Sequence, residues 1–139
     1  MKYFKSTVTT NTEETQKLGE SFSKYLKPGN IVALIGNLAA GKPSFVKGVL
    51  KGLDYKYEVT SPTFTLINEY YAKSKVIHVD FFREENIIRW NELGFQDMIN
   101  SDSIILIEWA DLIPDLLPNI DYKLYFEHNG ENKRKIRLK

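Results

Sequence analysis

The stretch IVALIGNLAAGK, residues 31–42, decides how the rest of this chain is interpreted. Its first half is apolar, as in a buried strand, and the segment after it carries apolar side chains at helical spacing at Phe45, Val49 and Leu53. A strand, a glycine-containing loop and a helix in this order predict a phosphate-binding loop, because loop N–H groups and the helix N-terminus converge on phosphate oxygens. The residues expected to hold the phosphates are Gly36, Asn37, Leu38, Ala39, Ala40, Gly41 and Lys42.

The residues after the loop lysine depart from the usual pattern. A nucleotide-hydrolysing loop normally continues with Ser or Thr, whose hydroxyl binds Mg²⁺, whereas Pro43 offers neither a hydroxyl nor an N–H. Ser44 is a candidate substitute ligand for Mg²⁺, although a shift of one helical position turns a side chain by about 100°. We therefore expect nucleotide binding, with Lys42 on the terminal phosphates, to survive more readily than metal-dependent hydrolysis. A glycine-rich turn that binds nothing is the alternative.

The composition of the 139-residue chain is that of an ordinary globular domain, with 42% hydrophobic and 27% charged residues. This length favours one domain, residues 1–139, with a single sizeable core. The net charge of +1 gives no overall field that would attract DNA or a membrane, and the chain has no cysteine for disulfides or thiolate metal sites. Residues 1–6 lack a signal-peptide pattern and no apolar run approaches the ~20 residues that span a bilayer, so we expect a cytoplasmic protein.

Local patterns place the remaining elements. Asn11 and Glu14 form a capping-box pattern at the start of a helix that should end before Lys27. Two strand-like segments, in residues 66–70 and 75–80, are joined by a short turn and predict an antiparallel pair, so the sheet is expected to be mixed. The other expected elements are a strand at 3–9, a loop helix ending near Gly52, helical turns at 84–100 interrupted at Gly94, a strand at 103–109 and a hairpin at 121–139.

Two carboxylates stand at the ends of predicted strands. Asp80 ends a mostly apolar strand, where open α/β sheets carry their ligand chemistry, although a carboxylate that caps the next segment fits the local pattern equally well. Glu108 ends four consecutive apolar residues, the pattern of a buried strand that delivers an acid to a Mg²⁺-nucleotide site. Glu108 would hold Mg²⁺ or orient the attacking water, and the pattern leaves both roles open. Trp109, next to it, is expected to be a packed rim residue.

The last predicted strand is strongly basic and has two interpretations. Charge along an edge strand protects it from pairing with other chains, which favours a structural role. A basic ridge that faces nucleotide phosphates or RNA is the alternative. Its basic residues are Lys133, Arg134, Lys135, Arg137 and Lys139. His78 and His128 have no second histidine or cysteine at ligand spacing, so we assign neither to a metal.

Several blocks together resemble one family, the bacterial TsaE proteins, which are small P-loop ATPases that serve in threonylcarbamoyladenosine modification of tRNA. The most specific block is SPTFTLINEY at residues 61–70, whereas the phosphate loop alone would fit hundreds of families. The other matching blocks are residues 36–42 followed by SFVKG at 44–48, HVDFFR at 78–83, ELGF at 92–95 and IEWA at 107–110, with a weaker match at residues 11–15.

The resemblance implies a three-layer α/β P-loop NTPase-like domain with a mixed, partly antiparallel sheet. It implies ATP or ADP and Mg²⁺ as cofactors, the TsaD and TsaB proteins as partners, and an indirect relation to tRNA. Family members hydrolyse ATP to reset the TsaD–TsaB assembly, which itself transfers the threonylcarbamoyl group. Carried over by position, Lys42, Asp80 and Glu108 are catalytic, Glu108 and Ser44 bind the metal, and Thr65 lies near the γ-phosphate. Asn11 and Arg134 are expected to frame the nucleotide base.

Two departures from the family pattern weigh on the activity. Ala39 stands where glycine is usual, and Pro43 stands where threonine is usual. Pro43 weakens the metal site most, because phosphoryl transfer depends almost entirely on positioning and charge neutralisation. Two other functions stay open: a small-molecule kinase, and a nucleotide-sensing interaction subunit without hydrolysis. The kinase is disfavoured because the chain offers few arginines to bridge donor and acceptor; they are Arg83, Arg89, Arg134 and Arg137.

Overall fold

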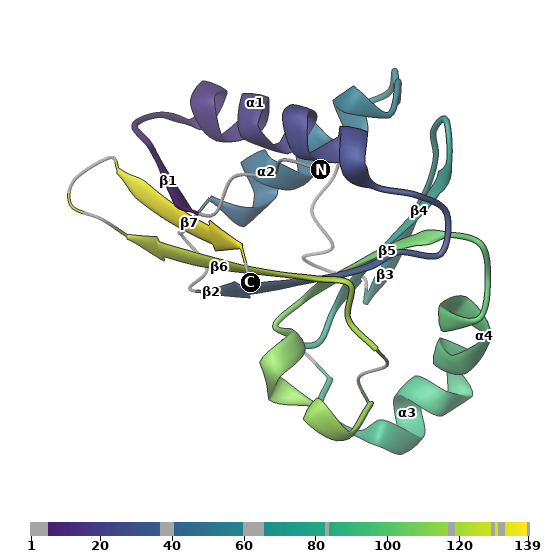
Figure 1. Ribbon diagram of the computed structural model, residues 1–139. Coiled ribbons are helices and arrows are strands. Elements are labelled where there is room, and N and C mark those ends of the chain that lie inside the picture. Colours follow the sequence, from purple (N-terminus) through teal and green to yellow (C-terminus); the bar gives the residue numbers. More distant parts are fainter. Residues whose placement is uncertain are drawn as a thin grey trace.

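A seven-stranded mixed sheet organises the fold. The structure, a computed structural model, describes residues 6–36, 41–59, 66–82, 84–116, 119–128, 130 and 133–138. Helices cover both faces, with α1 and α2 on one side and α3 and α4 on the other (Figure 1). The strands are β1 (Ser6–Thr9), β2 (Ile31–Gly36), β3 (Ile67–Tyr71), β4 (Lys75–Asp80), β5 (Ile104–Glu108), β6 (Tyr122–His128) and β7 (Arg134–Leu138). The helices are α1 (Thr12–Phe22), α2 (Lys42–Gly52), α3 (Ile87–Glu92) and α4 (Phe95–Ile99), with short 3₁₀ turns at Ser23–Tyr25, Ala110–Leu112 and Pro114–Leu116.

The strand order β1-β7-β6-β2-β5-β4-β3 confirms the mixed sheet. Strands β6, β2, β5 and β4 run parallel in its centre, and the strand of the phosphate loop, β2, lies between β6 and β5. The β3–β4 pair is antiparallel, as predicted from its short turn. The prediction that the last strand is an edge strand is wrong: β7 pairs with β6 on one side and with β1 on the other. The pairing of β1 with β7 could not be predicted from local patterns, because the two strands come from opposite ends of the chain.

Successive side chains of the central strands point to opposite faces of the sheet, so the protein has two separate apolar cores. Val32 and Leu34 pack with Leu106 and with helix α2, whereas Ala33 and Ile107 pack on the opposite face with α3 and α4. Both cores are apolar because each parallel strand is covered on both faces. In β4, residues 76, 78 and 80 share the α2 face, and the same alternation puts residue 108 of β5 on that face. Polar side chains at these positions therefore face the helix that follows the phosphate loop.

Helices α1 and α2 approach each other through glycine. A Cβ atom on Gly48 would collide with the backbone carbonyl of Gln16, and one on Gly19 would collide with the carbonyl of Phe45. The absence of both side chains lets the two backbones touch, which fixes the start of α1 beside the start of α2 (Figure 1).

The remaining elements lie close to their predicted positions. α2 ends at Gly52, and the helical turns after residue 84 break at Gly94, which has a left-handed φ of +84°. The hairpin is confirmed, and the first strand is described from Ser6 onward. Among the described residues, no helix is long and apolar enough to cross a membrane. Expectations for residues 37–40 and for Thr65 fall outside the described part of the chain.

Candidate functional site

The carboxyl ends of β2, β5 and β4 form one edge of the parallel sheet, and the phosphate-loop residues Gly36 and Gly41 lie there. Gly36 has a φ of +149°, and a Cβ atom on it would collide with the Phe126 carbonyl on the neighbouring strand. Gly41 has a φ of +96° and immediately precedes α2. Both positions require glycine, because L-residues with a side chain rarely adopt these angles. The two ends of the loop are thus built as the sequence predicted.

Lys42 begins α2 and turns back toward the strand that precedes the loop. Its Nζ donates to the Gly36 carbonyl at 2.8 Å and lies 3.9 Å from Glu108 Oε1, with the residue only 1% exposed. Burial holds the pKa of Lys42 below its ordinary value, and the nearby carboxylates of Glu108 and Asp80 oppose that effect. The ammonium group is therefore held between the end of β2 and the start of α2, beside the carboxylate of Glu108.

Glu108 is the second buried ionisable group at this edge. His78 Nε2 donates to Glu108 Oε2 at 2.6 Å, and both residues are buried. Burial alone would raise the pKa of Glu108, but the His78 hydrogen bond, together with the charges of His78 and Lys42, holds it below its ordinary value. Glu108 is thus an ionised carboxylate with a fixed orientation.

Asp80 lies directly opposite Glu108 in the β4–β5 register. Its Oδ1 accepts a hydrogen bond from the Phe82 N–H at 2.8 Å, so the structural role considered from the sequence, capping of the next segment, is present. Burial raises the pKa of Asp80, and the negative charge of Glu108 adds to that rise. Asp80 therefore joins the site as the weaker acid of the pair.

Trp109 covers Lys42. The Lys42 ammonium lies 4.2 Å from the centroid of the Trp109 ring, which also packs against Phe82 at 4.9 Å between ring centroids. The Trp109 backbone has a left-handed φ of +57°, and its N–H donates to the Leu34 carbonyl at 3.2 Å. This backbone conformation turns the chain at the end of β5. The contact between the Lys42 ammonium group and the Trp109 ring is favourable, because an indole face attracts a cation. Trp109 is half-exposed, as expected of a rim residue, and also contacts the loop lysine.

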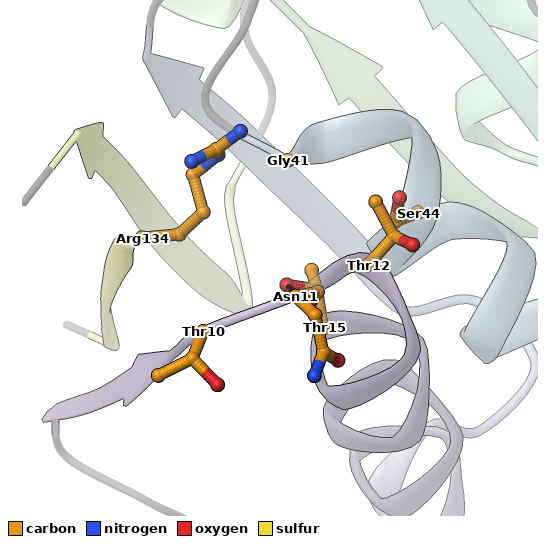
Figure 2. Close-up of a pocket in the computed structure, with 7 residues that line it drawn as sticks. All are labelled: Thr10, Asn11, Thr12, Thr15, Gly41, Ser44 and Arg134. Atoms are coloured by element: carbon orange, nitrogen blue, oxygen red, sulfur yellow. Dashed lines mark hydrogen bonds between the residues drawn. The ribbon is translucent and has the colours of Figure 1, made fainter. Parts of the chain in front are cut away.

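A cavity of about 360 Å³ adjoins the start of α2. Figure 2 shows its wall: Thr10, Asn11, Thr12 and Thr15 come from the β1–α1 connection and helix α1, Gly41 and Ser44 from the start of α2, and Arg134 from β7. A Cβ atom on Gly41 would lie 3.4 Å from Thr15 Cγ2 and 3.5 Å from Arg134 Cγ, so these side chains flank the end of the loop. The structure thus brings Asn11, Arg134 and the phosphate loop together, although they are far apart in the sequence.

The cap of α1 holds Asn11 in place. Asn11 Oδ1 accepts the Glu14 N–H at 2.8 Å, as the capping-box pattern predicts. The return bond is displaced by one residue, because Glu14 Oε1 accepts from the N–H and the hydroxyl of Thr10, each at 2.6 Å. These hydrogen bonds lower the pKa of Glu14. The Asn11 side chain is therefore a structural cap that also lines the cavity.

The structure places the two predicted metal ligands, Ser44 and Glu108, in different surroundings. Ser44 lines the cavity with Asn11 and Arg134, whereas Glu108 is held between His78 and Lys42. Pro43 is exposed in the first turn of α2, a position that tolerates proline. Over the described ranges, no three His, Cys, Asp or Glu side chains form a metal-binding group. A magnesium ion with a nucleotide does not require such a group, since it takes one or two protein ligands, phosphate oxygens and water.

Sequence reasoning did not find the role of His78. The signal was its position two residues before Asp80, because alternate residues of a strand share a face and a parallel neighbour ending in Glu108 would meet that face. The pairing of β4 with β5 was needed to use this signal. Trp109 left no comparable signal, because its ring reaches Lys42 only through the left-handed turn after β5.

A parallel strand that ends in a glycine loop, a lysine at the start of the next helix and carboxylates on the neighbouring strands define a P-loop α/β protein. A family model described as "Threonylcarbamoyl adenosine biosynthesis protein TsaE" matches residues 9–136, and this chain belongs to the TsaE family. The family's role, tRNA threonylcarbamoyladenosine biosynthesis, is given in its name and in those of the curated relatives. The resemblance found in the sequence and the predicted fold class are both confirmed.

The similarity extends over most of the chain. The TsaE protein of Bacillus subtilis is 35% identical over 129 residues, which cover 92% of this chain and 80% of that protein. The TsaE protein of Aquifex aeolicus is 36% identical over 141 residues, covering 99% and 98% of the two chains. The crystal structure of Bacillus subtilis YdiB matches with a TM-score of 0.79 and 30% identity, over 96% of this chain and 82% of that one.

Proposed function

We propose that this protein binds ATP or ADP with Mg²⁺ at the phosphate loop and hydrolyses ATP as an accessory subunit that resets a TsaD–TsaB complex. The observation that carries the proposal is the position of Lys42. Its ammonium group lies between the Gly36 carbonyl and Glu108 at the N-terminus of α2, where the helix dipole also favours an anion. A buried cation at this place has a clear use as a phosphate ligand.

The cavity supports the nucleotide end of the proposal. It opens beside Gly41 and Ser44, where the phosphates would leave the loop, and Arg134 and Asn11 line its wall. We assign Arg134 and Asn11 to the base and ribose, and the loop N–H groups with Lys42 to the phosphates. The residues assigned to the phosphates and those assigned to the base and ribose both adjoin Gly41. This arrangement fits a nucleotide, which has an anionic end and a planar end.

The two carboxylates take different roles in this proposal. Glu108 has a lowered pKa and a fixed orientation, so it suits a metal-associated carboxylate, together with the hydroxyl of Ser44. Bound Mg²⁺ would neutralise charge on the terminal phosphates. Asp80 has a raised pKa, so it suits the acceptance of a proton from the attacking water. This assignment follows the rule that neighbouring acids with pKa values pushed apart divide the acid and base work.

Pro43 limits hydrolysis in this proposal, since the usual metal-binding hydroxyl is missing. The test is the Pro43→Thr variant, assayed for release of free phosphate from ATP with TsaD and TsaB present. We expect the variant to hydrolyse ATP faster than the natural chain and to respond more steeply to Mg²⁺. An unchanged rate would show that Ser44 or another group already fills the role. Release of free phosphate, rather than its transfer to a metabolite, also separates an ATPase from a kinase.

The same proline favours a second candidate function, a nucleotide-sensing subunit without useful hydrolysis. ATP titrations with and without Mg²⁺ distinguish the two. Binding that strengthens with Mg²⁺, together with turnover in the presence of the partners, supports the ATPase. Metal-independent binding with no turnover, in a chain that still associates with TsaD and TsaB, supports the sensor. No ATP binding in either condition would refute both.

A further inference from the structure

Six lysines gather around the end of α2 that lies away from the phosphate loop, on the walls of two shallow hollows. The first hollow, of about 390 Å³, lies along α2 and the segment after it. The second, of about 420 Å³, lies between the end of α1, the end of α2 and the β3–β4 turn. We call this surface the lysine face; it consists of Lys24, Lys27, Lys47, Lys51, Lys56 and Lys73.

The fold, rather than the sequence, concentrates these charges. The Lys73 N–H donates to the Leu53 carbonyl at 2.8 Å, which ties the β3–β4 turn to the end of α2. Gly52 lies so close to Ser23 that a Cβ atom there would collide with it, which brings the end of α1 to the same place. Three segments that are distant in the chain thus bring their lysines close to the end of α2.

The charges of the lysine face are exposed and outnumber the nearby carboxylates. All six side chains are exposed, and within the described part of the chain none of them forms an ion pair. The carboxylates nearby in the sequence are Glu20, Asp54 and Glu58, of which Glu58 lines the first hollow, and they are half as many as the six lysines. The whole chain carries a net charge of only +1, so this surface is a local concentration of positive charge on a nearly neutral protein.

An exposed aromatic ring lies among the lysines. Tyr57 is 78% exposed, yet its ring packs against Tyr55, which packs against the buried Tyr70 with 5.2 Å between ring centroids. The Tyr57 ring is thus held by a T-shaped contact with Tyr55, and most of its surface is exposed to solvent. A ring of this kind beside lysines combines a stacking surface for a base with charges for a phosphate backbone.

We propose that the lysine face binds RNA directly, with the lysines on backbone phosphates and Tyr57 stacked on an unpaired base. RNA is favoured over an acidic protein because an acidic protein would not need the open ring, and because tRNA is the molecule named in the family's pathway. The face extends from Lys47, near the middle of the 11-residue helix α2, to the far end of that helix, about 15 Å from Lys42. None of its lysines lines the cavity beside Gly41, so the proposal does not depend on nucleotide binding there.

The test measures binding of the full chain to labelled unmodified tRNA by fluorescence anisotropy over a series of salt concentrations. The variant combines Lys51→Glu and Lys73→Glu, one from each hollow. We expect affinity to fall about tenfold or more and the salt slope to decrease by about 1–2, since each lost phosphate contact removes roughly one released counterion. A second variant, Tyr57→Ala, should weaken binding to single-stranded RNA and leave the salt slope unchanged.

The matched control combines Lys17→Glu and Lys123→Glu, two exposed lysines that line neither hollow, with the same total charge change. It should retain RNA affinity within about twofold. Equal loss in both double variants would show that only overall charge matters and would overturn the proposal. Unchanged affinity in the first variant would also overturn it, as would displacement of the RNA by polyglutamate at equal charge concentration, which would assign the face to an acidic protein. ATP binding, measured in parallel, separates this outcome from failure of the ATPase proposal.

Discussion

His78 donates its Nε2–H to Glu108 Oε2 across 2.6 Å, which ties β4 to β5 where the phosphate loop begins. Because this contact orients the carboxylate without reaching the ligand site itself, His78 is a positioning residue. We expect His78→Leu to lower the ATPase rate about tenfold and to leave the KM for ATP nearly unchanged. His78→Gln, whose amide donates a hydrogen bond, should restore much of the rate. Equal losses in both variants would contradict the positioning role.

The lowered pKa of Glu108 predicts a pH dependence of stability. Its ionised form is favoured in the folded state, so its contribution is present above the ordinary value near 4.5 and is lost as the pH falls through the lowered folded value. We expect the difference in unfolding free energy between the natural chain and Glu108→Gln to be largest at neutral pH. It should shrink as the pH falls below about 4.5, as measured by urea unfolding. A difference that is the same at pH 7 and pH 3 would contradict this.

The raised pKa of Asp80 predicts a pH dependence of stability with the opposite sign. Burial disfavours its ionised form, so Asp80 costs stability at neutral pH; that cost decreases as the pH falls through the raised folded value and is gone below the ordinary value near 3.8. Asp80→Asn keeps the acceptor for the Phe82 N–H and should raise Tm by roughly 1–3 °C at pH 7, a small gain because solvent screens a half-buried group. Turnover should fall by about 10²-fold or more if Asp80 is the base. A lower Tm for this variant would refute the assigned cost.

The glycine contact between α1 and α2 is testable through stability alone. Gly48→Ala places a methyl group against the Gln16 carbonyl, so the helices must separate. We expect a loss of about 1–3 kcal/mol in the free energy of unfolding. The control is Lys47→Ala, an exposed position on the same helix, which should change stability by less than about 0.5 kcal/mol. Equal effects of the two substitutions would show that the close approach is not needed.

A substitution at Arg134 tests whether the cavity binds the nucleoside part of ATP. Arg134→Gln removes the only charged group of the described cavity wall and should raise the Kd for ATP roughly tenfold or more. Lys133→Gln, on the neighbouring residue, should leave the Kd nearly unchanged. Calorimetric titration with ATP and with inorganic triphosphate adds a further check, because triphosphate lacks the base and ribose and its affinity should change less. An unchanged Kd for ATP in Arg134→Gln would remove the nucleoside from this cavity.

Features that depend on neighbouring residues could be predicted from the sequence. The strand that ends at Gly36, the helix that begins at Lys42, the cap at Asn11 and the break at Gly94 follow from periodicity and capping within a few residues. The antiparallel β3–β4 pair follows in the same way from its short turn. The acid at Glu108 was also foreseen, since a run of apolar residues ending in a carboxylate marks a buried strand with a polar end.

Other features were set by contacts between distant parts of the chain. β7 became an internal strand because β1 pairs with it, His78 met Glu108 because β4 pairs with β5, and the cavity beside Gly41 formed because glycine contacts hold α1 against α2. Local patterns constrain only backbone conformation and the face that a residue occupies. Which faces meet depends on strand order and helix packing, and these are chosen by the free energy of burying the whole sheet.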